Sequence, residues 1–486
     1  LMYFLGLDVG TKNIKAVILD EDGKIIEKAS TPIYDLVRRP REGFVERDPL
    51  ELWNRVLETL KRLKNISKVS GLCVDATSGT IVPIDVNGVP LYPLIMYNDR
   101  RAVKEAEELK MRSSAASVFE KFLPITPTLV LPKLMWLKKY LNNFGRVFKV
   151  LHESDYIVYK LTGVIATSAN TAGKSHALLK GRGYLVEAYN DVEIPVELMP
   201  EIKEIGEIIG KVSAKASKLT GIPEGTPVVN GMTDASAGDI TSGAISPGQA
   251  GVTIGTSLTL HAVVDKVVPD PDKRFYYKVY VGGNYLAGGF TNAGTTAFDT
   301  ISKLFNKSLE ELTKLAENVP LGSNGLISCT EWYGVRVPKT YPGLQGFIIG
   351  LSENNANPGA IFRSLLEGSA ATLKLLLNAV EETTGVKILD IRVSGGASRN
   401  KLFMQILADV LNREIKVVAE PDSAIGSAIL AASSILNEKI KKLVSKSIEI
   451  SNVFYPRSYL SKKYSYLVEK YKEVVNALGS ILMPLK

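Results

Sequence analysis

The chain has 486 residues, of which 45% are hydrophobic, 23% charged and 8% aromatic. These values are typical of a globular protein and exclude fibrous and disordered classes. At roughly 150 residues per domain, the length predicts about two to four domains. Lys and Arg total 59 against 51 Asp and Glu, so the formal net charge is +8, without any block of five like charges. We therefore expect no nucleic-acid partner.

Cysteine usage and hydropathy narrow the cellular setting. Cys73 and Cys329 lie far apart, without a Cys-x-x-Cys pair or a secretory apolar segment near the N-terminus. This pattern predicts neither a zinc site nor a disulfide framework. The uncharged apolar runs are shorter than the ~18 residues that a membrane span needs. The sequence therefore predicts a cytoplasmic protein with no membrane partner.

The first elements predict a sheet packed by helices. Apolar runs at 3–7, 14–19 and 25–26 alternate with turns at 8–13 and 20–24, which is typical of three successive strands. Asp48 and Pro49 then form a helix start, with proline at the first helical position. Apolar residues follow at helical spacing up to Leu63. The predicted fold class is α/β.

An internal similarity divides the chain into two halves. Residues 6–11 and 251–256 both read Gly, apolar, any residue, apolar, Gly, Thr, and each segment precedes an apolar strand. The offset, 251 minus 6, is 245 residues, about half the chain, so we expect two related halves that meet between residues 241 and 248. In the second half the pattern predicts helices at 359–382, 401–411, after Asp422 and at 459–478, and strands at 387–393 and 415–418.

Each half contains a Gly-Thr turn between two predicted strands. Such a turn presents consecutive backbone N–H groups that suit phosphate oxygens. For either turn alone a plain hairpin turn is the better interpretation, whereas the pair favours a phosphate site. The predicted phosphate contacts are Gly10, Thr11 and Lys12 in the first turn and Gly255, Thr256 and Ser257 in the second.

Two carboxylates are candidates for chemistry. Asp8 ends a strand that reads as buried, where an isolated carboxylate is costly unless it meets a cation such as Mg²⁺. The alternative is an aspartate that caps its own turn. Asp234 follows Gly-Met-Thr at a strand-to-helix junction. Because the chain has only three histidines, we expect Asp234 to act as the general base.

Other nucleotide signatures are weaker. No Gly-x-Gly-x-x-Gly follows a strand, and Gly173-Lys174-Ser175 lacks the first glycine of a P-loop, since that position is Ser168. Residues 394–400 (Ser-Gly-Gly-Ala-Ser-Arg-Asn) follow a predicted strand and open a helix. Their glycines would admit an adenine or a ribose. A helix-initiating turn explains the same residues equally well.

Together these segments resemble the FGGY family of carbohydrate kinases. The resemblance covers nearly the whole chain and depends on the order and spacing of moderately specific motifs at 6–12, 43–49, 98–102, 132–137, 155–163, 231–234, 255–257, 346–351, 363–367 and 395–400. It implies two related actin-like (ribonuclease H-like) ATPase domains flanking a central cleft. Residues 1–244 would form the N-terminal domain, on the sugar and Mg²⁺ side, and residues 245–486 the C-terminal domain, on the ATP side.

The resemblance also implies an activity, which is transfer of the γ-phosphoryl group of ATP, with Mg²⁺, to a primary hydroxyl of a small sugar or polyol. Asp234 matches the family's catalytic base. Asp8 and Asp234 would both lie near the Mg²⁺ ion. Asp99 matches a substrate-side position. The remaining matches are Gly255, Thr256 and Gly294 near the phosphates and Gly395, Gly396, Ala397 and Asn400 near the adenosine.

Substrate choice follows from residues 74–80 (Val-Asp-Ala-Thr-Ser-Gly-Thr). They resemble the Asp-x-Thr segment of ribulokinases, whereas glycerol kinases carry Arg-Glu there and bacterial xylulokinases Met-His-Gly. The resemblance favours a ketopentose, ribulose ahead of xylulose, with glycerol or another polyol behind. Asp75, Ala76 and Thr77 are the predicted sugar contacts, and turn capping by Asp75 stays open. Residues 327–338 depart from the family's usual Gly-Glu-Arg-x-Pro segment.

A second class of function competes with this one. An actin- or Hsp70-like switching ATPase would share the Gly-Thr turns and Asp8 but would not need Asp99 or the 75–80 segment. For the kinase, the expected partners are a small-molecule sugar, Mg²⁺ and ATP, and a homodimer is one assembly that the family allows.

Overall fold

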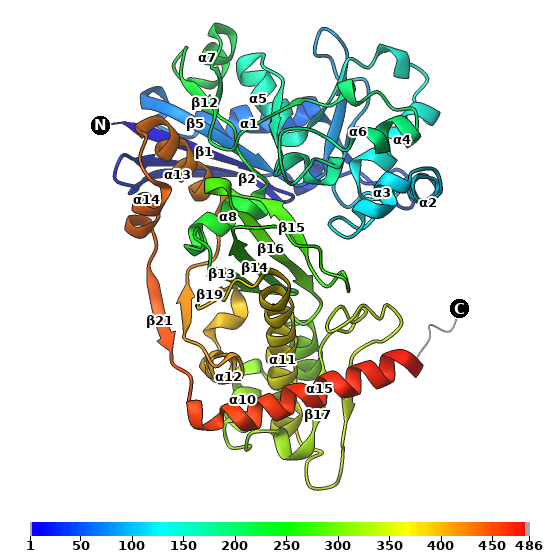
Figure 1. Ribbon diagram of the computed structural model, residues 1–486. Coiled ribbons are helices and arrows are strands. Elements are labelled where there is room, and N and C mark those ends of the chain that lie inside the picture. Colours follow the sequence, from blue (N-terminus) through cyan, green and yellow to red (C-terminus); the bar gives the residue numbers. More distant parts are fainter. Residues whose placement is uncertain (1, 482–486) are drawn as a thin grey trace. The chain divides into compact units, whose positions relative to one another are not determined.

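The computed structural model describes residues 2–481, which separate into two compact units (Figure 1). Unit 1 comprises residues up to 243 together with 278–283 and 422–447. Unit 2 comprises residues 244–277, 284–421 and 448–481. The predicted division between residues 244 and 245 therefore lies next to the main boundary. The structure adds two later segments of the chain to unit 1.

Unit 1 contains a six-stranded sheet with the strand order β11-β12-β5-β1-β2-β3. β1 pairs antiparallel with β2 and parallel with β5, and β5 pairs parallel with β12. The central strands are almost wholly buried because they consist of apolar residues. The strands are β1 (Tyr3–Val9), β2 (Asn13–Asp20), β3 (Ile25–Pro32), β5 (Val69–Ala76), β11 (Ile208–Lys211) and β12 (Pro227–Val229).

Helices cover this sheet. α1 (Pro49–Lys61) begins where predicted, since Asp48 Oδ1 accepts hydrogen bonds from Leu50 N (2.7 Å) and Glu51 N (3.0 Å). α13 (Ser423–Leu436) packs on β1 and β5 and also on α8 (Asp234–Ser242). The other helices packed on or beside the sheet are α5 (Glu153–Thr162), α7 (Ala214–Thr220) and α14 (Ile440–Ser447).

A second layer of unit 1 surrounds a smaller hydrophobic core. Its four-stranded sheet has the order β4-β7-β6-β8, and a short parallel pair joins β9 to β10. These strands are β4 (Glu46–Arg47), β6 (Ile81–Ile84), β7 (Leu94–Ile95), β8 (Lys149–His152), β9 (Ala166–Ser168) and β10 (Glu201–Lys203). The helices are α2 (Val103–Arg112), α3 (Ser114–Phe119), α4 (Val130–Tyr140) and α6 (Val186–Asp191).

Unit 2 is built on a seven-stranded sheet with the order β15-β16-β14-β13-β19-β20-β21. The strands are β13 (Gln249–Ile254), β14 (Leu258–Val264), β15 (Tyr276–Val279), β16 (Tyr285–Thr291), β19 (Asp390–Ser394), β20 (Ile415–Val418) and β21 (Ile450–Phe454). A separate antiparallel pair joins β17 (Ile327–Cys329) to β18 (Phe347–Ile349).

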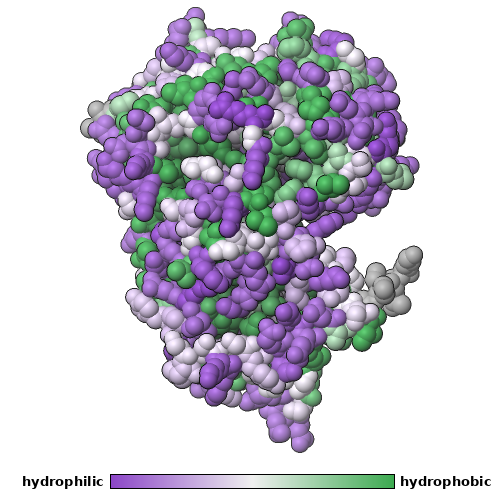
Figure 2. Space-filling model, in the orientation of Figure 1, coloured by the Kyte–Doolittle hydropathy of each residue, from purple (hydrophilic) through white to green (hydrophobic). Residues whose placement is uncertain are grey.

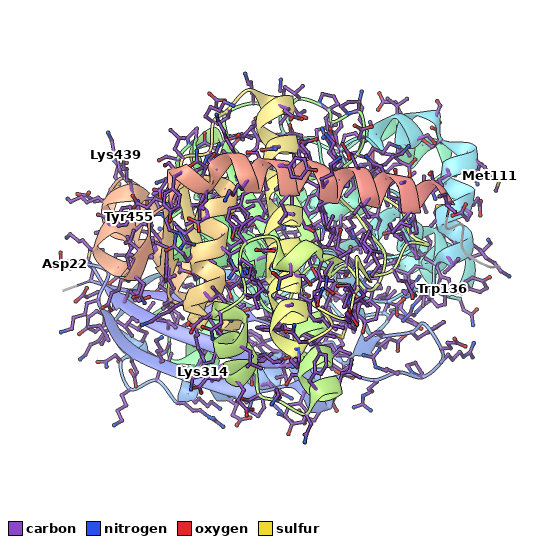
Figure 3. All side chains as sticks on the ribbon, turned by 90° about the horizontal axis from the view of Figure 1, so that it is seen from below. Asp22, Met111, Trp136, Lys314, Lys439 and Tyr455 are labelled. Atoms are coloured by element: carbon purple, nitrogen blue, oxygen red, sulfur yellow. The ribbon has the colours of Figure 1, made fainter. Side chains whose placement is uncertain are left out.

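The helices of unit 2 include the long buried α11 (Pro358–Thr384), which α15 (Ser461–Ile481) crosses in the view of Figure 3. The hydroxyls of Thr372 on α11 and Tyr471 on α15 hydrogen bond at 2.9 Å. The other helices are α9 (Thr296–Phe305), α10 (Leu309–Glu317) and α12 (Lys401–Leu411). The last has the predicted bounds because Asn400 caps it.

The two sheets repeat one pattern of strand pairing. In each unit the strand that leads into the Gly-Thr turn pairs antiparallel with the next strand. On its other edge it pairs parallel with a strand more than 60 residues later, β5 in unit 1 and β19 in unit 2. That strand pairs parallel with one more, β12 or β20. The predicted α/β class with two related halves is therefore confirmed.

No helix within residues 2–481 has both the length and the apolar character to cross a bilayer. Figure 2 shows hydrophilic residues over most of the visible face, with apolar residues scattered between them. Such scattered apolar residues are normal on a protein surface.

Candidate active site

Three carboxylates of unit 1 come together at the ends of neighbouring elements. Asp8 lies near the end of β1 and is paired in register with Asp75 on β5. Asp234 is the first residue of α8, and the residue before it, Thr233, forms an isolated parallel bridge to Ala76. All three carboxylates interact electrostatically, which places them in one acidic cluster.

Two glycines allow this convergence. A Cβ atom at Gly6 would lie 1.7 Å from the carbonyl oxygen of Ala424, and one at Gly426 would lie 1.9 Å from that of Ala237. No side chain fits at either position, so α13 packs with its backbone directly against β1 and α8. The close packing brings Ser423 and Ser427 of α13 to the acidic cluster.

Asp8 Oδ1 and Asp75 Oδ1 are both buried without a hydrogen-bond partner among the described residues, so a proton shared by the two carboxyls would satisfy them. Asp75 is fully buried and also accepts a hydrogen bond from Ser427 Oγ. Burial, then Asp234, raises the pKa of Asp8 to about 6. Burial, then the charge of Asp8, raises the pKa of Asp75 well above its ordinary value. Both shifts favour the protonated form, so we expect the two carboxyls to retain one proton as a pair.

Asp234 is suited to accept a proton. Its Oδ1 accepts a hydrogen bond from Ala235 N at 2.7 Å, and its Oδ2 has no hydrogen-bond partner within the described chain. Burial raises the pKa of Asp234, while the hydrogen bond from Ala235 N and the charges of Lys278 and Lys174 oppose that rise. A raised pKa makes a carboxylate a better base at neutral pH.

Asp8 and Asp234 are the residues predicted to hold Mg²⁺, and this role stays a prediction. No group of three or more His, Cys, Asp or Glu side chains in residues 2–481 is arranged to hold a metal ion. Mg²⁺ usually keeps several waters and takes one or two carboxylates together with substrate phosphates. Asp8 and Asp234, the predicted metal residues, supply two such carboxylates.

The first Gly-Thr turn leaves backbone donors available. Gly10 N donates to Asn13 O at 3.0 Å, and the buried Arg47 donates to Gly10 O at 3.2 Å, so the turn is held from inside. Within the described residues, the backbone N–H groups of Thr11 and Lys12 have no acceptor. Adjacent unpaired N–H groups at a tight turn form an anion-binding site.

The second Gly-Thr turn, in unit 2, has the same property. Gly255 N donates to Ser257 O at 3.0 Å, whereas Thr256 N and Ser257 N lack an acceptor in the part of the chain that the structure describes. Gly294 abuts this turn, since a Cβ there would lie 2.4 Å from both Gly255 O and Thr256 O. Thr295 N also donates to Gly255 O at 2.7 Å, which joins the turn to the start of α9.

Unit 2 also contains a cavity of about 580 Å³, a size typical of small-ligand pockets. Gly396, Ala397 and Asn400 line it, three of the four predicted adenosine contacts. Phe298, Phe362 and Phe403 supply apolar wall, and Lys314 on α10, labelled in Figure 3, is another lining residue. No atom lies within 4 Å of a Cβ placed on Gly396, so this backbone is open to a ligand.

Two of the predicted adenosine contacts, Asn400 and Gly395, have structural roles. Asn400 Oδ1 accepts from Phe403 N at 3.0 Å, and its Nδ2 donates to Thr313 Oγ1 at 2.9 Å, so capping occupies the side chain. Gly395 has φ of +92°, and its Cβ would lie 2.5 Å from Ile254 O. Gly395 thus brings this turn against the end of β13 without lining the cavity.

The predicted sugar segment is engaged internally. Asp75 is buried in register with Asp8 and accepts a hydrogen bond from Ser427, and Ala76 is a buried strand residue. Thr77 Oγ1 lies 2.6 Å from Thr80 Oγ1 and donates to Glu153 Oε2 at 3.0 Å. These contacts favour a supporting role for the three predicted sugar residues, and their direct contact with sugar stays a prediction.

Asp99 is also fully paired. It is buried, and its two oxygens accept hydrogen bonds from Val45 N and from the backbone and guanidinium of Arg101. The guanidinium lies 4.0 Å from the ring centre of Phe44 and 4.8 Å from that of Trp136. The geometry favours Asp99 as the residue that orients Arg101 rather than as a direct sugar contact.

Lys174 is the site residue that sequence reasoning missed. Its stem lies on the turn at Gly79, whose added Cβ would meet Lys174 Cδ at 2.7 Å, and its Nζ lies 5.8 Å from the Tyr97 ring centre. Burial and Lys278 lower the pKa of Lys174 to about 8, against the opposing charge of Asp234. In residues 2–481 its ammonium has neither a hydrogen bond nor an ion pair. The only signal in the sequence was the incomplete P-loop motif.

Family models match both parts of the chain. The model described as the FGGY family of carbohydrate kinases, N-terminal domain, matches residues 3–241, and the C-terminal domain model of the same family matches residues 250–435. The first model spans the acidic cluster and Lys174. The second spans the second Gly-Thr turn and the cavity of unit 2.

Individual proteins are similar over almost their full length. The xylulose kinase of Bacillus subtilis (strain 168) is 26% identical over 505 residues, which cover 100% of this chain and 99% of that protein. The gluconokinase of the same organism is 27% identical over 458 residues, 88% of this chain and 86% of that protein. The crystal structure of a xylulose kinase from Rhodospirillum rubrum superposes with a TM-score of 0.90 at 25% identity, covering 99% of each chain.

Proposed function

We propose that this chain, which belongs to the FGGY family of carbohydrate kinases, transfers the γ-phosphoryl group of ATP to a primary hydroxyl of a ketopentose, ribulose or xylulose. One observation carries the proposal. Asp234 presents a carboxylate oxygen without a hydrogen-bond partner among the described residues, beside an unpaired Lys174 ammonium and the 74–80 segment.

Asp234 acts in this proposal as the general base. Its free Oδ2 accepts the proton of the attacking hydroxyl, which raises the nucleophilicity of that oxygen as it bonds to phosphorus. Because Oδ1 is fixed by Ala235 N at 2.7 Å, the carboxylate needs little reorganisation. The base therefore contributes both proton removal and alignment.

Backbone N–H groups would stabilise the negative charge that develops on the oxygens of the transferred phosphoryl group. The unpaired N–H groups of Thr11 and Lys12 in unit 1 and of Thr256 and Ser257 in unit 2 suit phosphate oxygens. Asp8 and Asp234 would hold Mg²⁺, which supplies positive charge to the phosphate oxygens when bound. The cavity beside Gly396 would receive the adenosine.

Lys174 contributes to sugar recognition. Its ammonium donates up to three hydrogen bonds and has no partner within residues 2–481, so sugar oxygens would satisfy it. Its stem lies on Gly79. The turn of residues 77–80 thereby sets the direction from which Lys174 reaches the sugar.

A second candidate substrate is an aldonate such as gluconate. Two cations, Lys174 and Lys278, interact electrostatically with Asp234, and a carboxylate substrate would complement them. The relatives include a gluconokinase from B. subtilis as well as xylulose kinases. The resemblance of residues 74–80 to ribulokinases favours the ketopentose.

The deciding experiment is coupled ADP release with Mg²⁺-ATP on D- and L-ribulose, D- and L-xylulose, gluconate, ribitol and glycerol. A sugar-dependent rate on one ketopentose near the ~10 s⁻¹ of ordinary enzymes supports the proposal. Saturation by gluconate alone replaces the ketopentose with an aldonate. A flat panel with steady ATP hydrolysis overturns the kinase proposal in favour of a switching ATPase.

A further inference from the structure

We infer that Asn170 is the positioning residue for the phosphoryl-transfer step, a single buried amide that fixes both the start of α8, with Asp234, and the segment of residues 278–283, which begins with Lys278. The inference rests on the proposed function, because it takes Asp234 as the general base. None of the sequence motifs above includes Asn170, which lies between β9 and the turn of residues 171–175.

All hydrogen-bonding groups of the Asn170 amide are used. Oδ1 accepts from Thr233 N at 2.9 Å and from Thr233 Oγ1 at 3.2 Å. Nδ2 donates to Ser236 Oγ at 2.9 Å and to Val279 O at 2.7 Å. The residue is only 2% exposed. A fully satisfied buried amide has one orientation, since any rotation leaves buried polar groups unpaired.

The first pair of bonds sets the start of α8. Thr233 is the N-cap residue of α8, with extended backbone angles, yet its side chain caps no N–H group of the helix. Its hydroxyl lies instead within hydrogen-bond distance of Asn170 Oδ1, at 3.2 Å, and of Ser236 Oγ, at 3.3 Å. The chain therefore enters α8 along a direction fixed by Asn170, and Asp234 is the very next residue. A shift of Thr233 moves the carboxylate of Asp234 with it.

The hydrogen bond that Asn170 Nδ2 donates to Val279 O restrains a second segment of the site. Val279 follows Lys278, whose charge acts on both Asp234 and Lys174. Residues 278–283 cluster with unit 1, although the chain on either side of them belongs to unit 2. The bond from Asn170 Nδ2 to Val279 O is a direct link between this short segment and the loop that follows β9. One amide thus fixes the base and the 278–283 segment that carries the neighbouring cation.

Asn170 is itself held rigidly. Thr171 N donates to Ser168 Oγ at 3.1 Å, which closes the turn around Asn170. At the other end of the turn, Ser175 Oγ lies 2.7 Å from His152 Nε2, and His152 Nδ1 lies 2.6 Å from Asp155 Oδ2. Lys174 belongs to the same turn of residues 171–175. Asn170 therefore relates the position of Lys174 to that of Asp234.

The expected effect is on kcat, since a displacement of about 1 Å at a reacting group can cost about 10²-fold in rate. Asn170→Ala should lower the sugar-dependent kcat by roughly 10- to 100-fold and leave the KM for ATP within about twofold. The matched control is Asn355→Ala in unit 2. Asn355 is also 2% exposed and fully engaged, with Ser352 N, Asn324 O and Gly350 O as partners. It should lose comparable thermal stability with kcat within about twofold.

A double-mutant cycle separates positioning from a general loss of packing. Thr233→Val removes the hydroxyl that lies 3.2 Å from Asn170 Oδ1 and 3.3 Å from Ser236 Oγ, and keeps the bond from Thr233 N to Asn170. Positioning predicts that the effects of Asn170→Ala and Thr233→Val on kcat are not additive, because both act on one contact. Additive effects, or an Asn170→Ala enzyme whose kcat falls no more than that of Asn355→Ala, would overturn the inference.

Hydrogen exchange tests the same restraint without any substrate. The amide of Thr233 is bonded to Asn170 Oδ1, so Asn170→Ala should speed exchange in peptides covering residues 231–240. Peptides covering 342–357 should be unchanged. A wild-type chain that phosphorylates no sugar contradicts the proposed function alone. Unchanged exchange at 231–240 contradicts the role of Asn170, whatever the substrate.

Discussion

Asp8 on β1 and Asp75 on β5 are paired in register across two neighbouring parallel strands, while Ser427 Oγ donates a hydrogen bond to Oδ2 of Asp75. Asp75 is predicted to contact the sugar, and Asp8 is predicted to lie near Mg²⁺. In the structure Asp75 is the more deeply buried of the two and lies beside Asp8 as a supporting residue. Burial, and then the charge of Asp8, raises the pKa of Asp75 and favours its protonated form. The protonation of this pair therefore affects folding as well as any role in catalysis.

Replacing Asp75 with asparagine should stabilise the protein at alkaline pH. The folded-state pKa of Asp8 is raised to about 6, so the folded state binds more protons than the unfolded state between about pH 4 and 6. Stability from this pair is thus present at low pH and lost as the pH rises. The introduced side-chain amide can donate to Asp8 without a titrating proton. We expect the melting temperature of Asp75→Asn, measured with EDTA, to exceed that of the wild type more at pH 8 than at pH 4.5.

The control for this measurement is Asp191→Asn, which changes an exposed carboxyl at the end of α6. Its difference from wild type should not vary between the two pH values. A stability difference for Asp75→Asn that is the same at pH 4.5 and pH 8 would show that the Asp8–Asp75 pair does not share a proton.

Asp234→Asn should abolish phosphorylation while ATP still binds. The amide keeps the shape of the side chain and the bond to Ala235 N but cannot accept the proton of the hydroxyl. A positioned base contributes roughly 10²–10⁴-fold, so kcat should fall by at least about 10²-fold. Nucleotide affinity, measured by calorimetry, should change little. Retention of more than about a tenth of the wild-type kcat would remove Asp234 as the base.

Lys174→Met should weaken sugar use specifically. Methionine retains most of the stem that packs on Gly79 and removes the unpaired ammonium. We expect kcat/KM for the sugar to fall about 10- to 100-fold and the KM for ATP to stay within about twofold, with Lys180→Met, an exposed neighbour, as the control. A larger loss for gluconate than for any ketopentose would favour an aldonate, and equal changes in sugar and ATP constants would exclude Lys174 from the sugar site.

Gly294→Ala should damage ATP use. The added Cβ would lie 2.4 Å from Gly255 O and Thr256 O, so the second Gly-Thr turn must move. Steady-state kinetics should show a KM for ATP raised about tenfold or more. Gly183→Ala is the matched control, since no atom lies within 4 Å of its Cβ. Unchanged ATP kinetics in Gly294→Ala would mean that this turn only joins two strands.

Elements with strong local signals could be predicted residue by residue. α12 occupies 401–411 as expected because an asparagine cap and a periodic apolar face are both local. The repeated Gly-Thr segments predicted two related sheets, and the strand pairing confirms them. The sequence could not place α13 with unit 1, because that placement depends on the approach of Gly6 and Gly426 to backbones distant in sequence.

In the candidate site, too, some features follow from the local sequence and others depend on tertiary contacts. By itself, the sequence determined the family, the α/β fold with two related halves, and the positions of Asp8, Asp234 and the Gly-Thr turns, since each depends on residues close together in the chain. Only the tertiary structure decided which side chains are free for a ligand. Asp75 and Asp99 are paired with Ser427 and Arg101, while Lys174 stays unpaired within the described residues. The physical reason is that a polar group's availability depends on its partners in space, and Ser427 is 352 residues from Asp75.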